Sequence, residues 1–181
     1  MRSPLAVALA LLSIASPSAA THARLRHEPR CILEAVARGI ADDIGRHRGP
    51  ATDAALRGAA RVPSMPRIRL ESETPLVEFL AAIQPQAPSV DRFSSFYSLS
   101  ANHIFLIDDA SYYAIFNTID RRSIEDSLAH EFVHYLQVAY LGYTVADLGT
   151  DDAEFMAIDY QRRYRERYVT GGETPPCPPD I

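Results

Sequence analysis

Residues 123–142 read SIEDSLAHEFVHYLQVAYLG, and this stretch decides the fold because it predicts one long helix. Apolar residues recur through it at three- and four-residue steps, which is the period of a helix that packs on a core. Gly142 is a natural stop, since glycine readily adopts the left-handed conformation that ends many helices. We therefore predict a helix over residues 123–141.

Inside this helix, residues 130–134 form the run His-Glu-Phe-Val-His. At about 3.6 residues per turn, His130 and His134 differ by about 40° around the axis and about 6 Å along it, so both imidazoles can reach one metal ion. Glu131 lies one step round the helix and can approach a water on that ion without being a ligand, which suits a general base. The alternative is two ordinary helix histidines, one of them beside Leu and Phe with an unmet hydrogen bond.

A catalytic zinc site generally has three protein ligands and an open fourth position, so a third ligand must lie elsewhere in the chain. Glu154 is the candidate, because it follows His134 by twenty residues on the next predicted helix, which can fold back beside the first through the turn at Gly142. The competing interpretation is a capping box in residues 151–154, in which Glu154 folds back to its own helix N-terminus. We expect one Zn²⁺ per chain, held by His130, His134 and Glu154.

The run 130–134, followed by Glu154-Phe155-Met156-Ala157, resembles the gluzincins, a family of zinc metallopeptidases that includes the thermolysin-like enzymes. The resemblance covers roughly residues 95–165. It implies a zincin-like fold and hydrolysis of peptide bonds by a metal-activated water, with Glu131 as general base. It also implies that the strand just before the metal-binding helix, residues 103–107, lines the groove and pairs with an extended peptide substrate.

The chain departs from the thermolysin-like pattern beyond the third ligand. Those members carry an acidic residue four positions after it, whereas here Ile158 occupies that position and Asp159 follows. Asp126 and Asp159 are the candidates for orienting a metal-binding histidine. The residue that stabilises the oxyanion is left open among side chains of suitable chemistry: Tyr140, Tyr143, Tyr160 and His103.

Hydrophobic periodicity predicts the elements around this helix. Helical patterns occur at 30–46, 75–83, 109–117 and 151–168, and β-prone runs at 67–71, 93–99 and 103–107, the last two as a hairpin. Residues 47–66 are predicted to be a loop with a short helical piece around 53–60, and the Pro-rich tail 171–181 to be extended. The order is typical of an α+β fold, with a small mixed or antiparallel sheet packed on the His-bearing helix and the following Glu-bearing helix.

Residues 1–20 have the pattern of a signal peptide, with Arg2, an apolar run from Leu5 and small residues at 18 and 20. Cleavage is expected before Thr21, which leaves residues 21–181 as a single domain that is secreted or periplasmic. The alternative is an uncleaved anchor, but about ten apolar residues are too few to cross a bilayer. Because an exported protein meets an oxidising compartment, Cys31 and Cys177 are expected to form a disulfide rather than two unpaired thiols.

Charge restricts the class of partner. Loss of Arg2 with the signal peptide changes the formal net charge from −5 to −6, which disfavours nucleic acid and anionic membranes. The Arg- and Tyr-rich residues 160–168 are interpreted as a helix with a packed tyrosine stripe and solvated arginines rather than a nucleic-acid site. The expected partner is a peptide or protein substrate. The alternative function is a secreted binding or regulatory module that keeps a zinc-peptidase fold without efficient catalysis.

Overall fold

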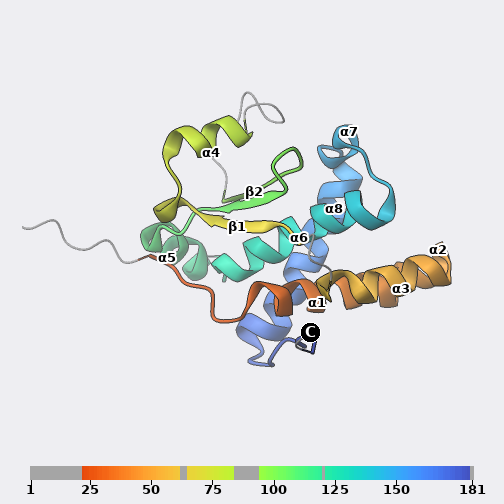
Figure 1. Ribbon diagram of the computed structural model, residues 1–181. Coiled ribbons are helices and arrows are strands. Elements are labelled where there is room, and N and C mark those ends of the chain that lie inside the picture. Colours follow the sequence, from red (N-terminus) through yellow and green to blue (C-terminus); the bar gives the residue numbers. More distant parts are fainter. Residues whose placement is uncertain (1–21, 62–64, 84–93, 120, 180–181) are drawn as a thin grey trace, which may run out of the picture.

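The computed structural model describes residues 22–61, 65–83, 94–119 and 121–179. These residues form an α+β arrangement of helices around a small sheet (Figure 1). The elements are α1 (Pro29–Ile40), α2 (Arg46–Arg48), α3 (Pro50–Gly58), β1 (Arg67–Leu70), α4 (Leu76–Ile83), β2 (Ser95–Ser98), β3 (His103–Leu106), α5 (Ala110–Ile119), α6 (Ile124–Leu141), α7 (Val145–Leu148) and α8 (Asp151–Tyr164). The α+β class is therefore confirmed.

The sheet is mixed and has the strand order β1-β3-β2. The predicted hairpin is confirmed, because β2 pairs antiparallel with β3 and places Phe96 opposite Phe105. β1 pairs with β3 in parallel, and α4 lies in the connection between them. Alternate residues of β3 face opposite sides: Ile104 and Leu106 join the main core, whereas Phe105 packs with Phe79 and Ile83 of α4. The sheet thus lies between α4 and α6 (Figure 1).

Helix α6 is the centre of the main core. It begins after Ser123, whose hydroxyl caps the helix by accepting a hydrogen bond from the Asp126 N–H, and it ends at Gly142, which has a φ of 78°. Leu128, Phe132 and Leu136 have no exposed surface. The helix packs against α8 and α1 on one side and against β2 and β3 on the other. A helix enclosed in this way holds its few polar side chains in fixed positions.

The predicted helix 30–46 is α1, continued by a π-helical segment at Ala41–Gly45. The predicted helix 151–168 is α8, also continued by a π-helical segment, Arg165–Thr170. Residues 47–66 contain more helix than predicted, because α3 already begins at Pro50, where a proline suits the first helical turn. The short helix α7 was not predicted.

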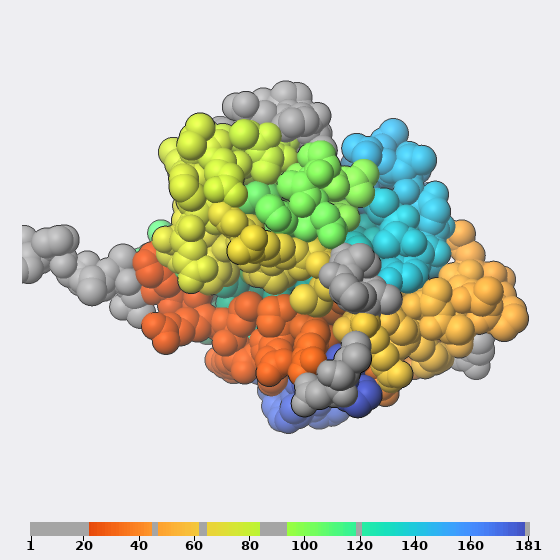
Figure 2. All heavy atoms as spheres, viewed as in Figure 1, coloured from red at the N-terminus to blue at the C-terminus, as the bar shows by residue number. Residues whose placement is uncertain are grey.

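The C-terminal tail of the described chain lies against α1. A disulfide joins Cys31 of α1 to Cys177 of the C-terminal tail, as predicted. α1 and the C-terminal residues are neighbours on one face of the molecule (Figure 2). The expected signal peptide and its cleavage site lie outside the described residues. Among the helices described, none combines the length and the apolar character needed to cross a membrane.

Candidate metal centre

Two helices supply the candidate site. His130, Glu131 and His134 lie on consecutive turns of α6, and Glu154 lies in the first turn of α8. α7 and the turn at Gly142 bring α8 back against α6, which places the Glu154 side chain beside the two imidazoles. The capping-box alternative for Glu154 is wrong, because Thr150 caps α8 and the Glu154 carboxylate contacts the histidines instead.

The three predicted ligands converge on one point. The Nε2 atoms of His130 and His134 are 3.1 Å apart. The carboxylate oxygens of Glu154 lie 3.5 Å from Nε2 of His130 and 3.4 Å from Nε2 of His134. The three side chains are therefore close enough to hold a metal ion, with the same nitrogen of each imidazole turned toward the carboxylate.

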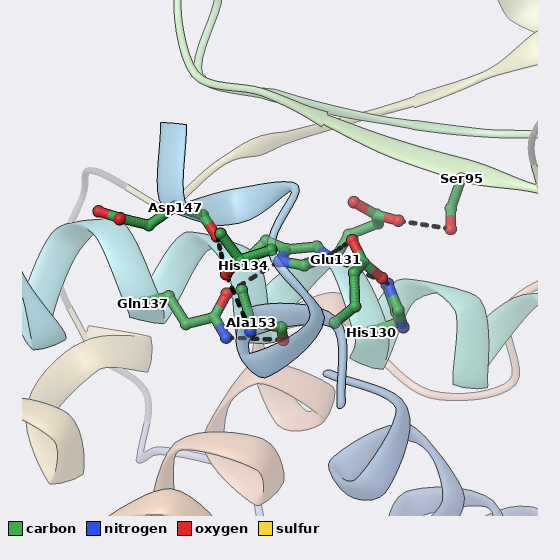
Figure 3. Close-up of polar contacts among 9 residues, drawn as sticks. Ser95, His130, Glu131, His134, Gln137, Asp147 and Ala153 are labelled. Carbon is green, nitrogen blue, oxygen red and sulfur yellow. Dashed lines mark hydrogen bonds and ion pairs between the residues drawn. The ribbon is translucent and has the colours of Figure 1, made fainter. Parts of the chain in front are cut away.

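A buried glutamine fixes the orientation of His134. Gln137 has no exposed surface, and its Nε2 donates to the Ala153 carbonyl at 3.0 Å (Figure 3). Its Oε1 therefore faces Nδ1 of His134, at 2.9 Å, and accepts the Nδ1 proton. In the neutral imidazole this tautomer leaves the lone pair of His134 on Nε2, the atom that faces Glu154 and His130, and this is the form that binds metals. In the cationic imidazole Nε2 also carries a proton and donates it to Glu154.

The electrostatics of the cluster favour a cation. Burial acts to lower the pKa of His134, but hydrogen bonding to Glu154 and Gln137 and the charge of Glu131 outweigh it and raise this pKa above its ordinary value. Hydrogen bonds from His130 and His134 lower the pKa of Glu154 well below its usual range, although burial opposes them. Glu154 is therefore an ionised carboxylate facing two imidazoles, which together form a donor set suited to a divalent ion.

Glu131 is held from the opposite side by the sheet. It is 4% exposed, and its Oε1 accepts a hydrogen bond of 2.6 Å from the Ser95 hydroxyl of β2. Figure 3 shows this contact next to the paired histidines. Glu131 is not one of the three converging side chains.

The cluster opens into a cavity of about 520 Å³. The sheet contributes residues 94–97 to its wall, and the α7 region contributes Val145, Leu148 and Gly149. α8 adds Ile158 and Gln161 beside Glu154, and Arg122 lies in the wall near the start of α6. The three candidate ligands and Glu131 are therefore accessible from one hollow, which can admit a molecule larger than water.

Several predictions about supporting residues are wrong. Asp126 does not orient a histidine, because its carboxylate bonds Gln161 and Arg165. Asp159 pairs with Arg162 and Arg163 on the surface of α8. The described cavity lining contains none of the four oxyanion candidates, and the Tyr160 hydroxyl donates to Asp43 instead. Strand 103–107 is not the groove strand either, since β3 is central in the sheet and residues 94–97 line the cavity.

Comparison with protein-family models, with curated proteins and with solved structures finds no match to this chain. Its function is therefore inferred from the residues of the site.

Proposed function

We propose that this chain is an exported zinc-dependent metallopeptidase of the gluzincin type. The observation that carries the proposal is the convergence of His130, His134 and Glu154. A tetrahedral zinc ion with ligand bonds of about 2.0–2.2 Å separates its ligand atoms by about 3.3–3.6 Å. The two Nε2 atoms are 3.1 Å apart and each has its own Glu154 oxygen at 3.4 or 3.5 Å, so the three side chains lie within reach of one such ion. The donor set of two imidazoles and one carboxylate also matches a common catalytic zinc site.

Zinc bound there would supply a Lewis acid that polarises a carbonyl group and lowers the pKa of water. The chain itself supplies the proton transfer. Glu131 is an acceptor beside the ligands, and it can take a proton from water as the oxygen attacks the peptide carbonyl. It can then pass this proton to the departing amine, which balances the reaction. The candidate ligands and Glu131 line the same cavity, whose wall includes α6, α8 and β2.

A peptide is a suitable occupant because the edge strand β2 runs along the cavity. Ser94, Ser95, Phe96 and Tyr97 line it, so an extended segment can lie parallel to this wall. Arg122 is the one permanently cationic side chain among the described lining residues. Its charge favours the negative charge that develops on the attacked carbonyl oxygen.

Export is part of the proposal. The disulfide between Cys31 and Cys177 is compatible with an oxidising compartment, where such bonds form and persist. We infer from it, together with the leader-like residues 1–20, that the working protein is secreted or periplasmic.

The proposal is tested on purified protein with a peptide library. The wild type should contain about one zinc per chain, and a chelator should abolish its cleavage of peptides. Glu131→Gln should keep the zinc and lose about 10²–10⁴-fold in kcat, because only the proton acceptor is removed. Glu154→Ala should lose the metal together with the activity.

Two results would contradict the peptidase assignment. Full activity of Glu131→Gln would remove the proposed base. A wild type that holds zinc but cleaves no peptide in a chelator-sensitive way would instead support a binding or regulatory module with the same metal centre.

A further inference from the structure

The hydroxyl of Ser95 touches the carboxylate that the proposed reaction uses as its base. Its hydrogen bond to Oε1 of Glu131 is 2.6 Å long and joins residues 36 positions apart in the chain. A hydroxyl that donates to a carboxylate over such a short distance is typical of a charge-assisted hydrogen bond. The contact connects β2 to α6 (Figure 3), and both residues line the cavity.

Packing fixes the place of Ser95 along α6. Ser95 and Tyr97 are alternate residues of β2 and therefore share one face of the strand. Glu131 and Tyr135 are four residues apart and share one face of α6. The Tyr97 and Tyr135 rings meet edge to face, with centroids 6.0 Å apart. Two neighbouring positions of the strand thus meet two neighbouring turns of the helix, so the hydroxyl is held opposite the carboxylate.

We propose that Ser95 is a positioning residue for Glu131, an inference that rests on the proposed function. The hydroxyl holds Oε1 and leaves Oε2 for proton transfer with water and with the departing amine. Without the hydroxyl, the carboxylate can turn about its side-chain torsions, and only part of the molecules hold it in the reactive position.

Ser95 also connects the base to the strand along which a peptide would lie. The N–H of Ile107 donates to the Ser94 carbonyl. In an antiparallel pair the residues alternate, so the backbone N–H and C=O of Ser94 point toward β3 and those of Ser95 point away from it. The backbone of Ser95 is therefore on the outer side of the sheet, while its side chain is on Glu131. One residue thus relates the register of a bound peptide to the position of the base.

The test compares Ser95→Ala with Ser95→Thr, which keeps a hydroxyl. Ser98→Ala is the matched control. It removes a hydroxyl of the same strand, and this hydroxyl contacts Ser100 rather than Glu131. Zinc content, melting temperature, kcat and KM are measured for each full-length mature protein. In addition, high-resolution crystal structures of the metal-free proteins report the conformers of Glu131.

Ser95→Ala should lower kcat by about 10- to 100-fold, the range expected from one hydrogen bond to a charged group, with KM and zinc content unchanged. Ser95→Thr should restore kcat, and Ser98→Ala should match the wild type. Glu131 should hold one conformer in the wild type and in Ser95→Thr, but several in Ser95→Ala. Unchanged kcat and a single Glu131 conformer in Ser95→Ala would overturn the inference. An inactive wild type would contradict the peptidase proposal alone, because the conformers of Glu131 still test Ser95.

Discussion

Gln137 shows how one buried amide sets the chemistry of a histidine. Its nitrogen is committed to the Ala153 carbonyl, so its oxygen faces Nδ1 of His134 and keeps the proton there. The same side chain connects α6 to the turn of α8 that carries Glu154, and so it couples two of the three candidate ligands. His130 differs, because its buried Nδ1 has no hydrogen-bond partner among the described residues.

Gln137→Leu should weaken zinc binding by about 10- to 100-fold, the usual effect of removing a partner that orients a ligand. Gln137→Glu is the comparison, since its carboxylate still accepts from Nδ1 of His134 although it cannot donate to Ala153. We expect Gln137→Glu to bind zinc more tightly than Gln137→Leu in competition with a chelator. Melting of the metal-free proteins separates a folding defect from a binding defect. Wild-type affinity in Gln137→Leu would contradict this role.

For individual residues, the sequence predicts those contacts that depend on spacing along a helix. His130, Glu131 and His134 share α6, and Glu154 lies in the first turn of the next helix that periodicity predicts, which is α8, so their meeting could be predicted. Gln137 follows His134 by three residues, a spacing that puts two side chains on one helix face and could have revealed it. Ser95 could not be found in this way, because its contact depends on how β2 packs against α6.

The pairing of α6 with α8 is the element-scale feature on which the site depends. Asp126 near the start of α6 has no exposed surface and bonds Gln161 of α8 and Arg165 just beyond it, the latter at 2.5 Å. This buried polar contact joins the helices on the side away from the turn at Gly142. The two helices are thus fastened at both ends of their shared length.

Asp126→Ala should lower the free energy of unfolding by about 3–5 kcal/mol, because it leaves the guanidinium of Arg165 in a mostly buried place without this negative charge. Asp159→Ala should cost less than about 1 kcal/mol, since its ion pairs with Arg162 and Arg163 lie on the surface. Urea denaturation of the two variants provides the measurement. Equal losses would show that the buried contact does not fasten the helices.

The short helix α7 forms part of the cavity wall and has a pH-sensitive cap. The side chain and backbone N–H of Thr144 both donate to the Asp147 carboxylate, and these bonds lower the pKa of Asp147 below its ordinary value. Because folding lowers the pKa of Asp147, the cap contributes its full stability when the pH is above the unfolded pKa of about 3.9. This contribution is lost as the pH falls through the lower pKa of the folded state.

Amide exchange should reveal this dependence. Protection of residues 145–149, corrected for intrinsic rates, should be steady near neutral pH and fall on acidification below about pH 4. In Asp147→Asn the protection should already be reduced at neutral pH. It should not fall further on acidification, because residue 147 no longer has a carboxylate to protonate. Asp152→Asn, on the exposed start of α8, is the control and should behave as the wild type. If protection in Asp147→Asn fell by the same amount on acidification, a group other than Asp147 would be responsible for the pH dependence.

Prediction of the elements succeeded where hydrophobic periodicity is long. α6 agrees with the predicted 123–141 within a residue, and β2 and β3 form the predicted hairpin. α7 was missed because four residues are too few to show a period, although Thr144 and Asp147 have the spacing of a capping box. The central place of β3 was missed because the sequence of a strand does not determine which strands pair with it.

A single disulfide fastens the C-terminal tail to α1. The disulfide joins Cys31, buried in α1, to Cys177 across a sequence separation of 146 residues. α1 packs directly on α6, so the extended tail is fastened to the helix layer that carries two of the candidate ligands. Such a long loop is where a cross-link restricts the unfolded chain most, by about 5 kcal/mol in the chain-entropy model.

The double variant Cys31→Ser with Cys177→Ser should therefore lose about 2–5 kcal/mol of unfolding free energy in urea, with little change of the folded structure. Reduction of the wild type by a thiol should give the same loss, which controls for the serine side chains. The zinc content should stay near one per chain below the unfolding transition, because neither cysteine belongs to the cluster of His130, His134 and Glu154. If the double variant unfolded at the wild-type urea concentration, native strain or residual order in the unfolded chain would cancel the restriction, and the stability of the domain would come from its non-covalent packing.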